Sequence, residues 1–248
     1  MKILISGLCG HMGKEVAKLA LEGKRGVESA FGVDAFMDNS PPVPCVKSFA
    51  EAPADVDCVI DFSHHSNTGA LLEFAVSHRL PLVLATTGQT EEEKEMIFSA
   101  AEKIPLFFAA NYSLGVALLI ELAKKAAAMM PDAEIEIIEA HHDRKIDAPS
   151  GTALAIADAI QTVRPGTSLK CGRNGQEKRT REEIGIHSVR MGNIVGMHEV
   201  LIGTETQTIT LKHEAHSRGL FAEGALAAAE FLIGKPIGLY NMKSMVQF

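Results

Sequence analysis

The sequence predicts an α/β protein with two domains: an N-terminal domain built on a parallel sheet, and an α+β domain with a largely antiparallel or mixed sheet. Two observations lead to this prediction. In the first half of the chain, short apolar runs alternate with helical patterns, as in parallel strand–helix–strand units. In the second half, polar and apolar residues alternate along several segments, as in sheets with one solvated face.

The composition is that of a globular protein with a sizeable core. The 248 residues are 46% hydrophobic and 22% charged, a balance that excludes an intrinsically disordered chain. The net charge of −7 argues against a nucleic-acid-binding module, which would carry a basic face. The most apolar long stretch, 115–130, is interrupted by Glu121, Lys124 and Lys125, so we expect no membrane-spanning helix and no membrane partner.

The cysteines and the N-terminus indicate a cytoplasmic protein. Cys9, Cys45, Cys58 and Cys171 are widely spaced and form no CxxC pair, so we expect reduced thiols and no metal site. The N-terminal segment MKILISGLCG soon becomes glycine-rich and lacks the long apolar region of a signal peptide.

The strands expected in the first half are short and nearly all apolar, which is typical of a sheet covered on both faces. The helices between them follow from apolar residues at helical spacing. Thr90-Glu91-Glu92-Glu93 adds a capping-box sequence, with Thr90 as N-cap and Glu93 at the third helical position. The expected strands are 2–6, 27–34, 57–62, 82–86 and 106–110, and the expected helices are 13–22, 68–78 and one that begins near Thr90.

The pattern changes after about Asn111. Strand 134–139 alternates glutamates with isoleucines, and segment 206–213 alternates polar and apolar residues, so each is expected to have one wet face. Segment 166–183, rich in Gly, Lys, Arg and Glu, is predicted to be a mobile surface loop. The other expected elements are helices 116–130, from about Thr152, and 220–233, and strands 186–190 and 196–202, which we expect to be antiparallel to 206–213.

A glycine-rich turn lies between the first strand and the first helix, as a dinucleotide-binding fingerprint requires. Gly7 allows the tight turn, Gly10 lets the backbone approach a pyrophosphate, and Gly13 lets the helix pack closely on the strand. The helix N-terminus offers free N–H groups to the phosphates. The spacing is G-x-x-G-x-x-G, with Cys9 where the usual motif has its second glycine. The expected cofactor-binding turn is Gly7, Leu8, Cys9, Gly10, His11, Met12 and Gly13.

Asp34, at the end of the second expected strand, is the candidate acidic partner for the ribose hydroxyls of the cofactor. An acid here favours NADH, because it would repel the 2′-phosphate of NADPH. No Arg or Lys follows directly, and position 11 of the turn is His rather than Arg. NADH or dual use is therefore favoured, and Lys14 and Lys47 are the residues that could assist NADPH binding.

The segment 139–152, EAHHDRKIDAPSGT, has the richest chemistry in the chain. His141 and Lys145 can together supply protons and positive charge. Ser150, Gly151 and Thr152 open a predicted helix, where N–H groups and hydroxyls can hold a carboxylate. A solvated loop is the alternative by composition. A metal site is disfavoured, because no third or fourth ligand has a suitable spacing.

The extended segment 139–158, EAHHDRKIDAPSGTALAIAD, resembles the signature of the 4-hydroxy-tetrahydrodipicolinate reductase family, also called dihydrodipicolinate reductases. These enzymes reduce an intermediate of bacterial diaminopimelate and lysine biosynthesis. The resemblance runs the full length of the chain and keeps the family's order. Its other segments are GLCGHMGKEV from Gly7, VIDFS at 59–63, ATTG at 85–88, FAANYSLGV at 108–116, SVRMGNIVGMHEV at 188–200 and GLYNM at 238–242.

The resemblance implies roles for individual residues. His141 would be the acid/base residue and Lys145 the proton donor. His142, Lys145, Ser150, Gly151 and Thr152 would hold the two carboxylates of a dicarboxylate heterocycle, which would become tetrahydrodipicolinate by hydride transfer from NAD(P)H. The nicotinamide side of the cofactor site would be lined by Ala85, Thr86, Thr87, Ala109, Ala110, Asn111 and Tyr112.

The resemblance also implies the architecture: a Rossmann domain of 1–112 plus 219–248, and a substrate-binding and tetramerising domain of 113–218. A homotetramer is implied through the second domain's sheet. The chain departs from the family pattern at Ala85, His65 and His11, where the family often has Gly, Pro and a basic residue. His64 and His65 are interpreted as a surface loop.

Two other functions are compatible with a dinucleotide-binding fold. One is another NAD(P)-dependent oxidoreductase acting on a different small dicarboxylate. One set of residues argues against this alternative: His141, His142, Lys145 and the Ser150–Thr152 turn. An oxidoreductase for another substrate would have no reason to contain this set. The other is a nucleotide-sensing module that regulates a partner, but the sequence shows no DNA-binding element or exposed apolar patch that would support it.

Overall fold

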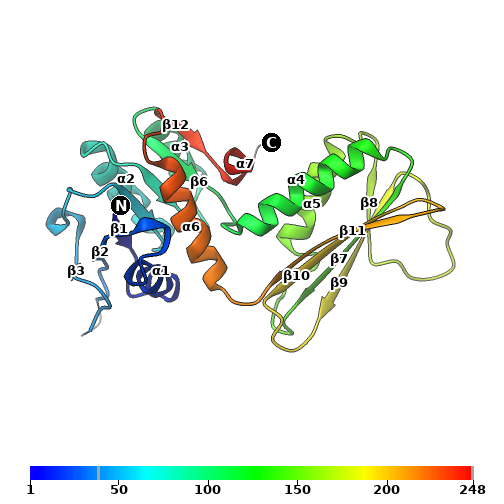
Figure 1. Ribbon diagram of the computed structural model, residues 1–248, viewed down its shortest axis with the longest axis horizontal. Helices are drawn as coiled ribbons and strands as arrows, with labels where there is room; N and C mark the ends of the chain where they lie inside the picture. The colour runs from blue at the N-terminus through cyan, green and yellow to red at the C-terminus, as the bar shows by residue number, and fades with distance from the viewer. Residues whose placement is uncertain (38–39, 247–248) are drawn as a thin grey trace. The chain divides into compact units, whose positions relative to one another are not determined.

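The computed structural model describes residues 1–37 and 40–246. The chain divides into two compact units, each with its own sheet. The first unit comprises Met1–Ser113 and Gly219–Phe248, and the second comprises Leu114–Arg218 (Figure 1). Among the described residues, no helix is long and apolar enough to cross a membrane.

The first unit is built on a parallel sheet in which the strand order is β12-β6-β5-β4-β1-β2-β3. The order reverses on either side of β1, which is the arrangement of a doubly wound nucleotide-binding sheet. Ligands bind such sheets beyond the carboxyl ends of the strands, at the reversal. The strands are β1 (Lys2–Ser6), β2 (Ser29–Val33), β3 (Cys45–Val46), β4 (Cys58–Asp61), β5 (Leu82–Leu84), β6 (Pro105–Phe108) and β12 (Gly238–Tyr240).

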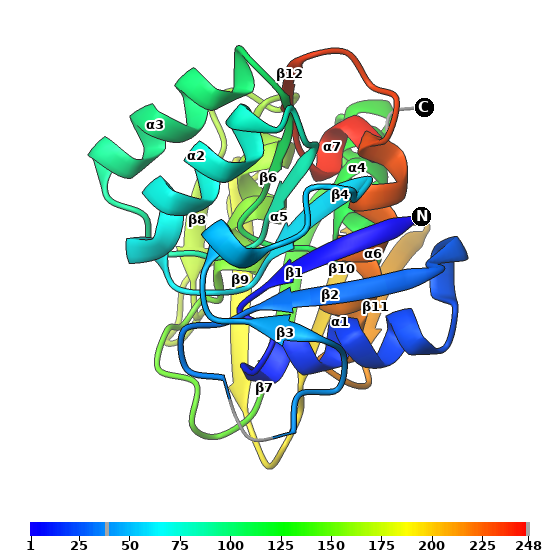
Figure 2. The ribbon, with the colours of Figure 1, turned by 90° about the vertical axis from the view of Figure 1, so that its left-hand side faces the viewer.

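Helices cover both faces of this sheet, as its nearly all-apolar strands predict. Helices α2 and α3 lie side by side on one face, and α1 and α6 on the other (Figure 2). On the α2 and α3 face, Leu71, Phe74 and Ile97 are buried against Leu4 and Val59 of the strands. The helices are α1 (His11–Leu21), α2 (Thr68–Ser77), α3 (Glu91–Ala101), α6 (Gly219–Leu232) and the short α7 (Met242–Met245).

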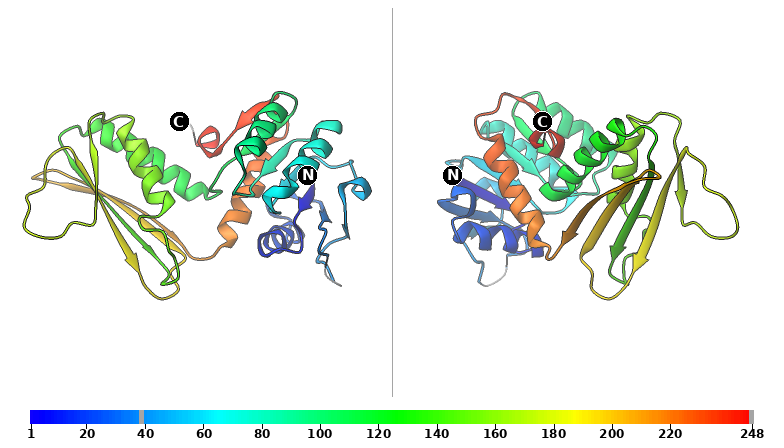
Figure 3. Two further views of the ribbon diagram at one scale, coloured as in Figure 1. Left: turned by 180° about the vertical axis from the view of Figure 1, so that it is seen from behind. Right: turned by 45° about the vertical axis from the view of Figure 1, so that its right-hand side comes forward.

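The second unit has a mixed five-stranded sheet in the order β11-β10-β7-β9-β8. Helices α4 (Leu114–Met129) and α5 (Gly151–Gln161) pack on one face, where they bury Leu119 and Ile156 among the sheet's isoleucines and valines (Figure 3). The strands are β7 (Glu134–His141), β8 (Ser168–Cys171), β9 (Glu183–Arg190), β10 (Gly196–Gly203) and β11 (Thr208–Ala215).

The predicted fold class is confirmed, with several local corrections. Strand β10 is antiparallel to β7 and β11, but β9 pairs in parallel with both β7 and β8, so the expectation of antiparallel pairing is wrong for β9. Segment 166–183 is not a loop throughout, because Ser168–Cys171 forms the edge strand β8. Strands β3 and β12 were not predicted, since they are very short and are fixed by pairing at the edges of the sheet.

Candidate functional site

The turn from β1 into α1 requires glycine at two positions. Gly7 has a φ of +78°, and a Cβ there would lie 2.6 Å from the carbonyl oxygen of Phe62. A Cβ on Gly13 would lie 2.1 Å from the carbonyl oxygen of Gly7. The tight turn and the close packing that we predicted for these glycines are therefore confirmed. Gly10 is the N-cap of α1, so the first backbone N–H groups of this helix follow it.

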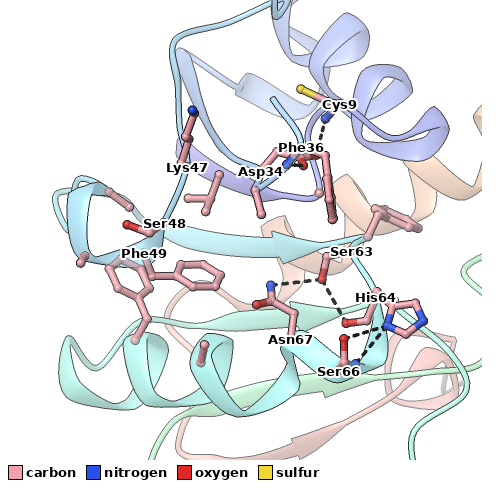
Figure 4. Close-up of a pocket in the computed structure, with 18 of the residues that line it drawn as sticks. Cys9, Asp34, Phe36, Lys47, Ser48, Phe49, Ser63, His64, Ser66 and Asn67 are labelled. Carbon is pink, nitrogen blue, oxygen red and sulfur yellow. Dashed lines mark hydrogen bonds between the residues drawn. The ribbon is translucent and has the colours of Figure 1, made fainter. Parts of the chain in front are cut away.

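A cavity of about 970 Å³ lies beside this turn, at the carboxyl ends of β1 and β2. Asp34 follows β2 on its wall, where one carboxylate oxygen accepts the Cys9 N–H at 2.9 Å and the other accepts the Phe36 N–H at 2.9 Å. These bonds fix the carboxylate without using all of its acceptor sites. Lys47, which follows β3, also lines the cavity (Figure 4).

A second cavity, of about 490 Å³, shares Phe62, Ser63 and His64 with the first, so the two adjoin along this wall. Its lining includes many of the cofactor residues that the sequence predicted. Tyr112 is buried, and its hydroxyl lies 2.8 Å from the carbonyl oxygen of Leu84, which fixes its ring. Predicted residues on this wall are His11, Met12, Ala85, Thr86, Thr87, Ala110, Asn111 and Tyr112.

A buried carboxylate holds part of this wall in place. Asp61, at the end of β4, accepts the Ser63 hydroxyl at 2.6 Å and the Thr86 hydroxyl at 2.5 Å. Burial raises the pKa of Asp61, while the hydrogen bonds from Ser63 and Thr86 oppose that rise. Asp61 thus ties the loop after β4 to the loop after β5.

Three of the predicted cofactor residues line neither cavity. Leu8 is fully buried and belongs to the core, while Gly13 packs against the turn backbone. Ala109 precedes the part of its loop that reaches the second cavity. We interpreted His64 and His65 as a surface loop. In the structure, His64 lines both cavities and His65 lines the second. The unusual His-His pair directly after VIDFS was the available signal, because loops after parallel strands bind ligands.

In the second unit, Glu139 and His141 project from the same face of β7, two residues apart. Glu139 is completely buried and lies 2.6 Å from His141 Nδ1. Its two oxygens also accept a bidentate pair of 2.8 Å hydrogen bonds from Arg190 of β9, and the Ser150 N–H at 3.2 Å. The carboxylate therefore orients the His141 ring, and a proton on Nδ1 leaves Nε2 free to accept a proton.

The titratable groups of this cluster differ in their charge at neutral pH. Although burial raises the pKa of Glu139, hydrogen bonds from Arg190, Ser188 and His141 lower it to about 2. Burial lowers the pKa of His141 more than the neighbouring Glu139 raises it. Burial also lowers the pKa of His198 to about 4, with a further contribution from His141. At neutral pH the cluster therefore holds an ionised Glu139 beside two neutral imidazoles.

The N-terminus of α5 lies beside this cluster. Ser150 caps α5 by accepting the Ala153 N–H, and its hydroxyl lies 3.1 Å from His198 Nε2. No described atom lies within 4 Å of the Cβ position on Gly151, so the first turn of the helix is open to a ligand. Thr152 follows it in this turn. A helix N-terminus favours an anion there.

Lys145 and His142 lie on the segment between β7 and α5. The Lys145 ammonium pairs with Asp147 at 2.8 Å, and its side chain is 22% exposed. The Nδ1 of His142 is buried and has no hydrogen-bond partner among the described residues. Such an unsatisfied polar atom is costly unless a ligand or water completes it. One stretch of chain, from the end of β7 to the N-terminus of α5, therefore carries His141, His142 and Lys145.

Glu139, Arg190 and His198 were not predicted as site residues. Glu139 was detectable, because it continues the inward-facing register of Ile135 and Ile137 in β7, where a charged residue needs a buried partner. Arg190 and His198 join it through sheet pairing that spans the chain from β7 to β9 and β10. Across residues 1–37 and 40–246, no three His, Cys, Asp or Glu side chains are grouped as a metal site would require.

Comparisons with known proteins agree along the whole chain. A family model described as dihydrodipicolinate reductase, N-terminus, matches residues 1–112, and one described as dihydrodipicolinate reductase, C-terminus, matches residues 115–246. A 4-hydroxy-tetrahydrodipicolinate reductase from Caldanaerobacter subterraneus subsp. tengcongensis is 45% identical, with 100% of this chain and 98% of the relative covered. One from Clostridium novyi is 40% identical, with 99% and 98% covered.

A solved structure shares the fold of the whole chain. It is dipicolinate-bound dihydrodipicolinate reductase from Paenisporosarcina sp. TG-14, with a TM-score of 0.83 and 26% identity. The similarity covers 100% of this chain and 99% of that one. An amine dehydrogenase from Mycobacterium smegmatis matches with a TM-score of 0.63 at 10% identity, which shows a common fold alone.

Proposed function

The chain belongs to the dihydrodipicolinate reductase family, and from that premise we propose how its residues carry out the reaction. The enzyme converts 4-hydroxy-tetrahydrodipicolinate to tetrahydrodipicolinate, in which the 4-hydroxyl leaves as water and NAD(P)H supplies the hydride, a step of diaminopimelate and lysine biosynthesis. We propose that the first unit binds the cofactor and that the second unit binds the substrate. The observation that carries the assignment is the Glu139–His141 pair, which is bonded to the N-terminus of α5 through the Ser150 N–H, with Lys145 on the segment that joins β7 to α5.

The first unit fits a nicotinamide dinucleotide. Gly7, Gly10 and the α1 N-terminus would hold the pyrophosphate, because only a turn without side chains lets a phosphate approach the backbone. Asp34 would accept the ribose hydroxyls in the larger cavity, and Thr86 and Tyr112 would border the nicotinamide in the smaller one. When bound, the cofactor supplies the hydride.

In the second unit, positive charge and hydrogen-bond donors would bind the two carboxylates of the substrate. Lys145 supplies the charge, and His142 would contribute from the same segment between β7 and α5. Ser150, Gly151 and Thr152 would hold a carboxylate at the α5 N-terminus. Two anchored carboxylates fix the ring's orientation, which is where much of the rate enhancement arises.

Lys145 is the proton donor in this proposal, because its ammonium carries the proton that the reduced ring must gain. His141 is neutral, so it acts through Nε2 as the acceptor that positions and relays that proton, while Glu139 stabilises positive charge on its ring. Asp147 holds Lys145 at 2.8 Å until the substrate carboxylates compete for the ammonium.

Substitution of these two groups tests the proposal. His141→Gln and Lys145→Ala should each lower kcat by about 10²–10⁴-fold, the usual contribution of a general acid–base group. Turnover is measured by oxidation of NADH or NADPH, with the substrate supplied by the upstream synthase. Lys170→Ala, in the same unit on β8, should leave kcat unchanged. A folded double variant with near-normal turnover would refute both roles.

For cofactor choice, we propose NADH or dual use. Asp34 places a negative charge in the larger cavity that disfavours a 2′-phosphate, whereas Lys47 on the same cavity can offset it. Lys47→Ala should lower kcat/KM for NADPH about tenfold more than for NADH, the effect of about 1.4 kcal/mol. Lys24→Ala is the matched control, since Lys24 is exposed outside the cavity. A wild-type preference for NADPH above about tenfold would contradict the role given to Asp34.

For assembly, we propose a homotetramer built through the second unit's sheet. Helices α4 and α5 cover one face of this sheet (Figure 3). The other face carries several apolar side chains. That face carries Ile138, Val189, Met197 and Leu201 among polar neighbours such as Glu199 and His187, and Val189 is 41% exposed. Exposed apolar residues on an uncovered sheet face favour burial against another copy.

A further inference from the structure

Two of the four cysteines come together beside the larger cavity. Cys45 of β3 is in register with Gly32 of β2, and a Cβ on Gly32 would lie 2.2 Å from the Leu8 side chain. Residues paired on neighbouring parallel strands project to the same face of the sheet. The Cys45 side chain therefore lies on the side occupied by Leu8, and Cys9 is the next residue in the turn.

The two cysteines are near neighbours. Cys9 is among the groups that act on the Cys45 thiol, which donates to the carbonyl oxygen of Val46 at 3.6 Å, and both cysteines are half-buried and free. Cys9 also lines the larger cavity, and its N–H donates to Asp34 at 2.9 Å (Figure 4). Burial raises the pKa of Cys45 to about 11, with further contributions from Cys9 and Asp34, so its thiol is protonated at neutral pH.

We propose that Cys9 and Cys45 form a reversible oxidation site whose disulfide closes the larger cavity to the dinucleotide. The effect on the cofactor rests on the function proposed above, whereas the thiol chemistry rests on the geometry alone. The other cysteines are unsuited to the role, because Cys58 is fully buried within β4 and Cys171 lies in the second unit on the edge strand β8.

A peroxide is the class of oxidant that balances this reaction. The sulfur of Cys9, a residue of the cavity lining, attacks the O–O bond, giving a sulfenic acid and one water. The Cys45 sulfur then displaces the hydroxyl from that sulfenic acid, so the S–S bond forms and a second water leaves. Two thiols have lost two electrons and two protons to the peroxide. A dithiol reductant restores both thiols by exchange.

The disulfide acts on the cavity through the backbone of the turn. A disulfide places its two sulfurs about 2.0 Å apart, far closer than two thiols in contact. Forming it draws the Cys9 segment toward β3 and disturbs the N–H bond that fixes Asp34. Asp34 is the proposed acceptor for the ribose, so the oxidised protein should bind NADH more weakly.

The experiment compares reduced and oxidised forms of the full chain in a Cys171→Ser background, which prevents linkage through that exposed thiol. The protein is treated with hydrogen peroxide, digested with trypsin and analysed by mass spectrometry, and NADH affinity is measured by fluorescence. We expect tryptic peptides 3–14 and 26–47 to be linked, and the Kd for NADH to rise about tenfold or more, or 1.4 kcal/mol. Dithiothreitol should reverse both changes.

Cys45→Ser is the decisive variant, because it removes the resolving thiol and leaves the cavity lining intact. It should bind NADH normally when reduced and should form no linked peptide when oxidised. Absence of the linked peptide from the Cys171→Ser protein overturns the proposal, as does a linked protein that still binds NADH with unchanged affinity. If the reduced protein fails to bind NADH, the larger cavity is not the cofactor site, and the proposed effect of the disulfide on cofactor binding is also refuted.

Discussion

At the scale of single residues, the buried Glu139 organises the second unit's site. It accepts hydrogen bonds from both Arg190 and His141, so one carboxylate links β7, β9 and the His141 imidazole. A charge without solvent exposure needs such a partner, because an unpaired buried ion costs several kcal/mol. Arg190 is that partner. The Glu139 carboxylate also accepts a hydrogen bond from His141 Nδ1, which orients the imidazole ring.

Replacing Glu139 by glutamine should change the titration of His141. Glu139 raises the pKa of His141 against the effect of burial, so its neutral substitute should lower that pKa further. NMR titration of the histidine ring measures this shift. We also expect kcat to fall at least about tenfold, or about 1.4 kcal/mol, because the imidazole loses its orientation.

The matched control is Glu136→Gln, since Glu136 pairs with Arg179 and His187 on the other face of the sheet. A His141 titration that is the same in wild type and in Glu139→Gln would show that the carboxylate does not act on the ring.

His198 should make the second unit sensitive to mild acid. Its pKa of about 4 when folded lies below the ordinary value of 6.5, so the unfolded chain takes up a proton first as the pH falls. Its contribution is therefore present above pH 6.5 and is lost progressively toward pH 4. Between about pH 7 and 5, the free energy of unfolding should fall by about 2 kcal/mol from this group.

Urea denaturation of wild type and His198→Gln at these two pH values checks the effect. The glutamine keeps a polar group near Ser150 but does not titrate, so its stability should fall less over the same interval. An equal fall in both proteins would assign the acid sensitivity to other groups.

At the scale of elements, the start of α3 is a feature that the sequence predicts correctly. Thr90 and Glu93 form the capping box that their sequence predicts, with the Thr90 hydroxyl accepting the Glu93 N–H. Glu93 also binds His65 Nδ1 at 3.0 Å, which joins the start of α3 to the loop that lines the second cavity. The cap therefore stabilises both a helix and a cavity wall.

Removal of this cap tests its contribution. Thr90→Ala should lower the free energy of unfolding by about 1 kcal/mol, the usual cost of losing an N-cap. Thr90→Ser keeps the hydroxyl and should stay close to wild type. Chemical denaturation of the three proteins measures the difference. An alanine variant as stable as the serine variant would mean that the cap contributes nothing to folding.

The elements that the sequence did not reveal have a common cause. Strands β3, β8 and β12 all lie at sheet edges and are only two to four residues long. A short strand carries too few residues for an alternating pattern, so its conformation depends on the neighbour to which it pairs. For β8, that neighbour is β9, which also has an inward-facing isoleucine pair.

At the scale of the whole molecule, two sheets serve two purposes. The parallel sheet is covered on both faces, so its ligand sites lie at the ends of its strands. The mixed sheet is covered on one face by α4 and α5, and the other carries the apolar side chains of Val189 and Leu201. The proposed assembly uses the second sheet and leaves the first for the cofactor.

Val189→Asp tests the proposed tetramer, because it places a charge at an exposed apolar position of the open face. We expect light scattering after gel filtration to show a smaller species, with an unchanged circular dichroism spectrum. Thr206→Asp adds the same charge in the turn between β10 and β11 and should leave the assembly unchanged. A wild-type monomer, or a tetrameric Val189→Asp variant, would contradict this use of the face.

The fold class, the glycine turn and most of the helices follow from the sequence alone. These features depend on local causes: a turn that only glycine can adopt at Gly7, a cap at Thr90, and apolar periodicity within one element. The segment from His141 to Thr152 was also visible, because its chemistry is contiguous in the chain.

The partners of that segment, and the neighbours of each thiol, depend on the tertiary structure. Glu139 and Arg190 form their ion pair through sheet register, and Cys9 reaches Cys45 because β3 pairs with β2 on the Leu8 side. Such contacts join residues 36 to 51 positions apart in the chain. No local propensity encodes them, because their energy exists only once the strands have paired.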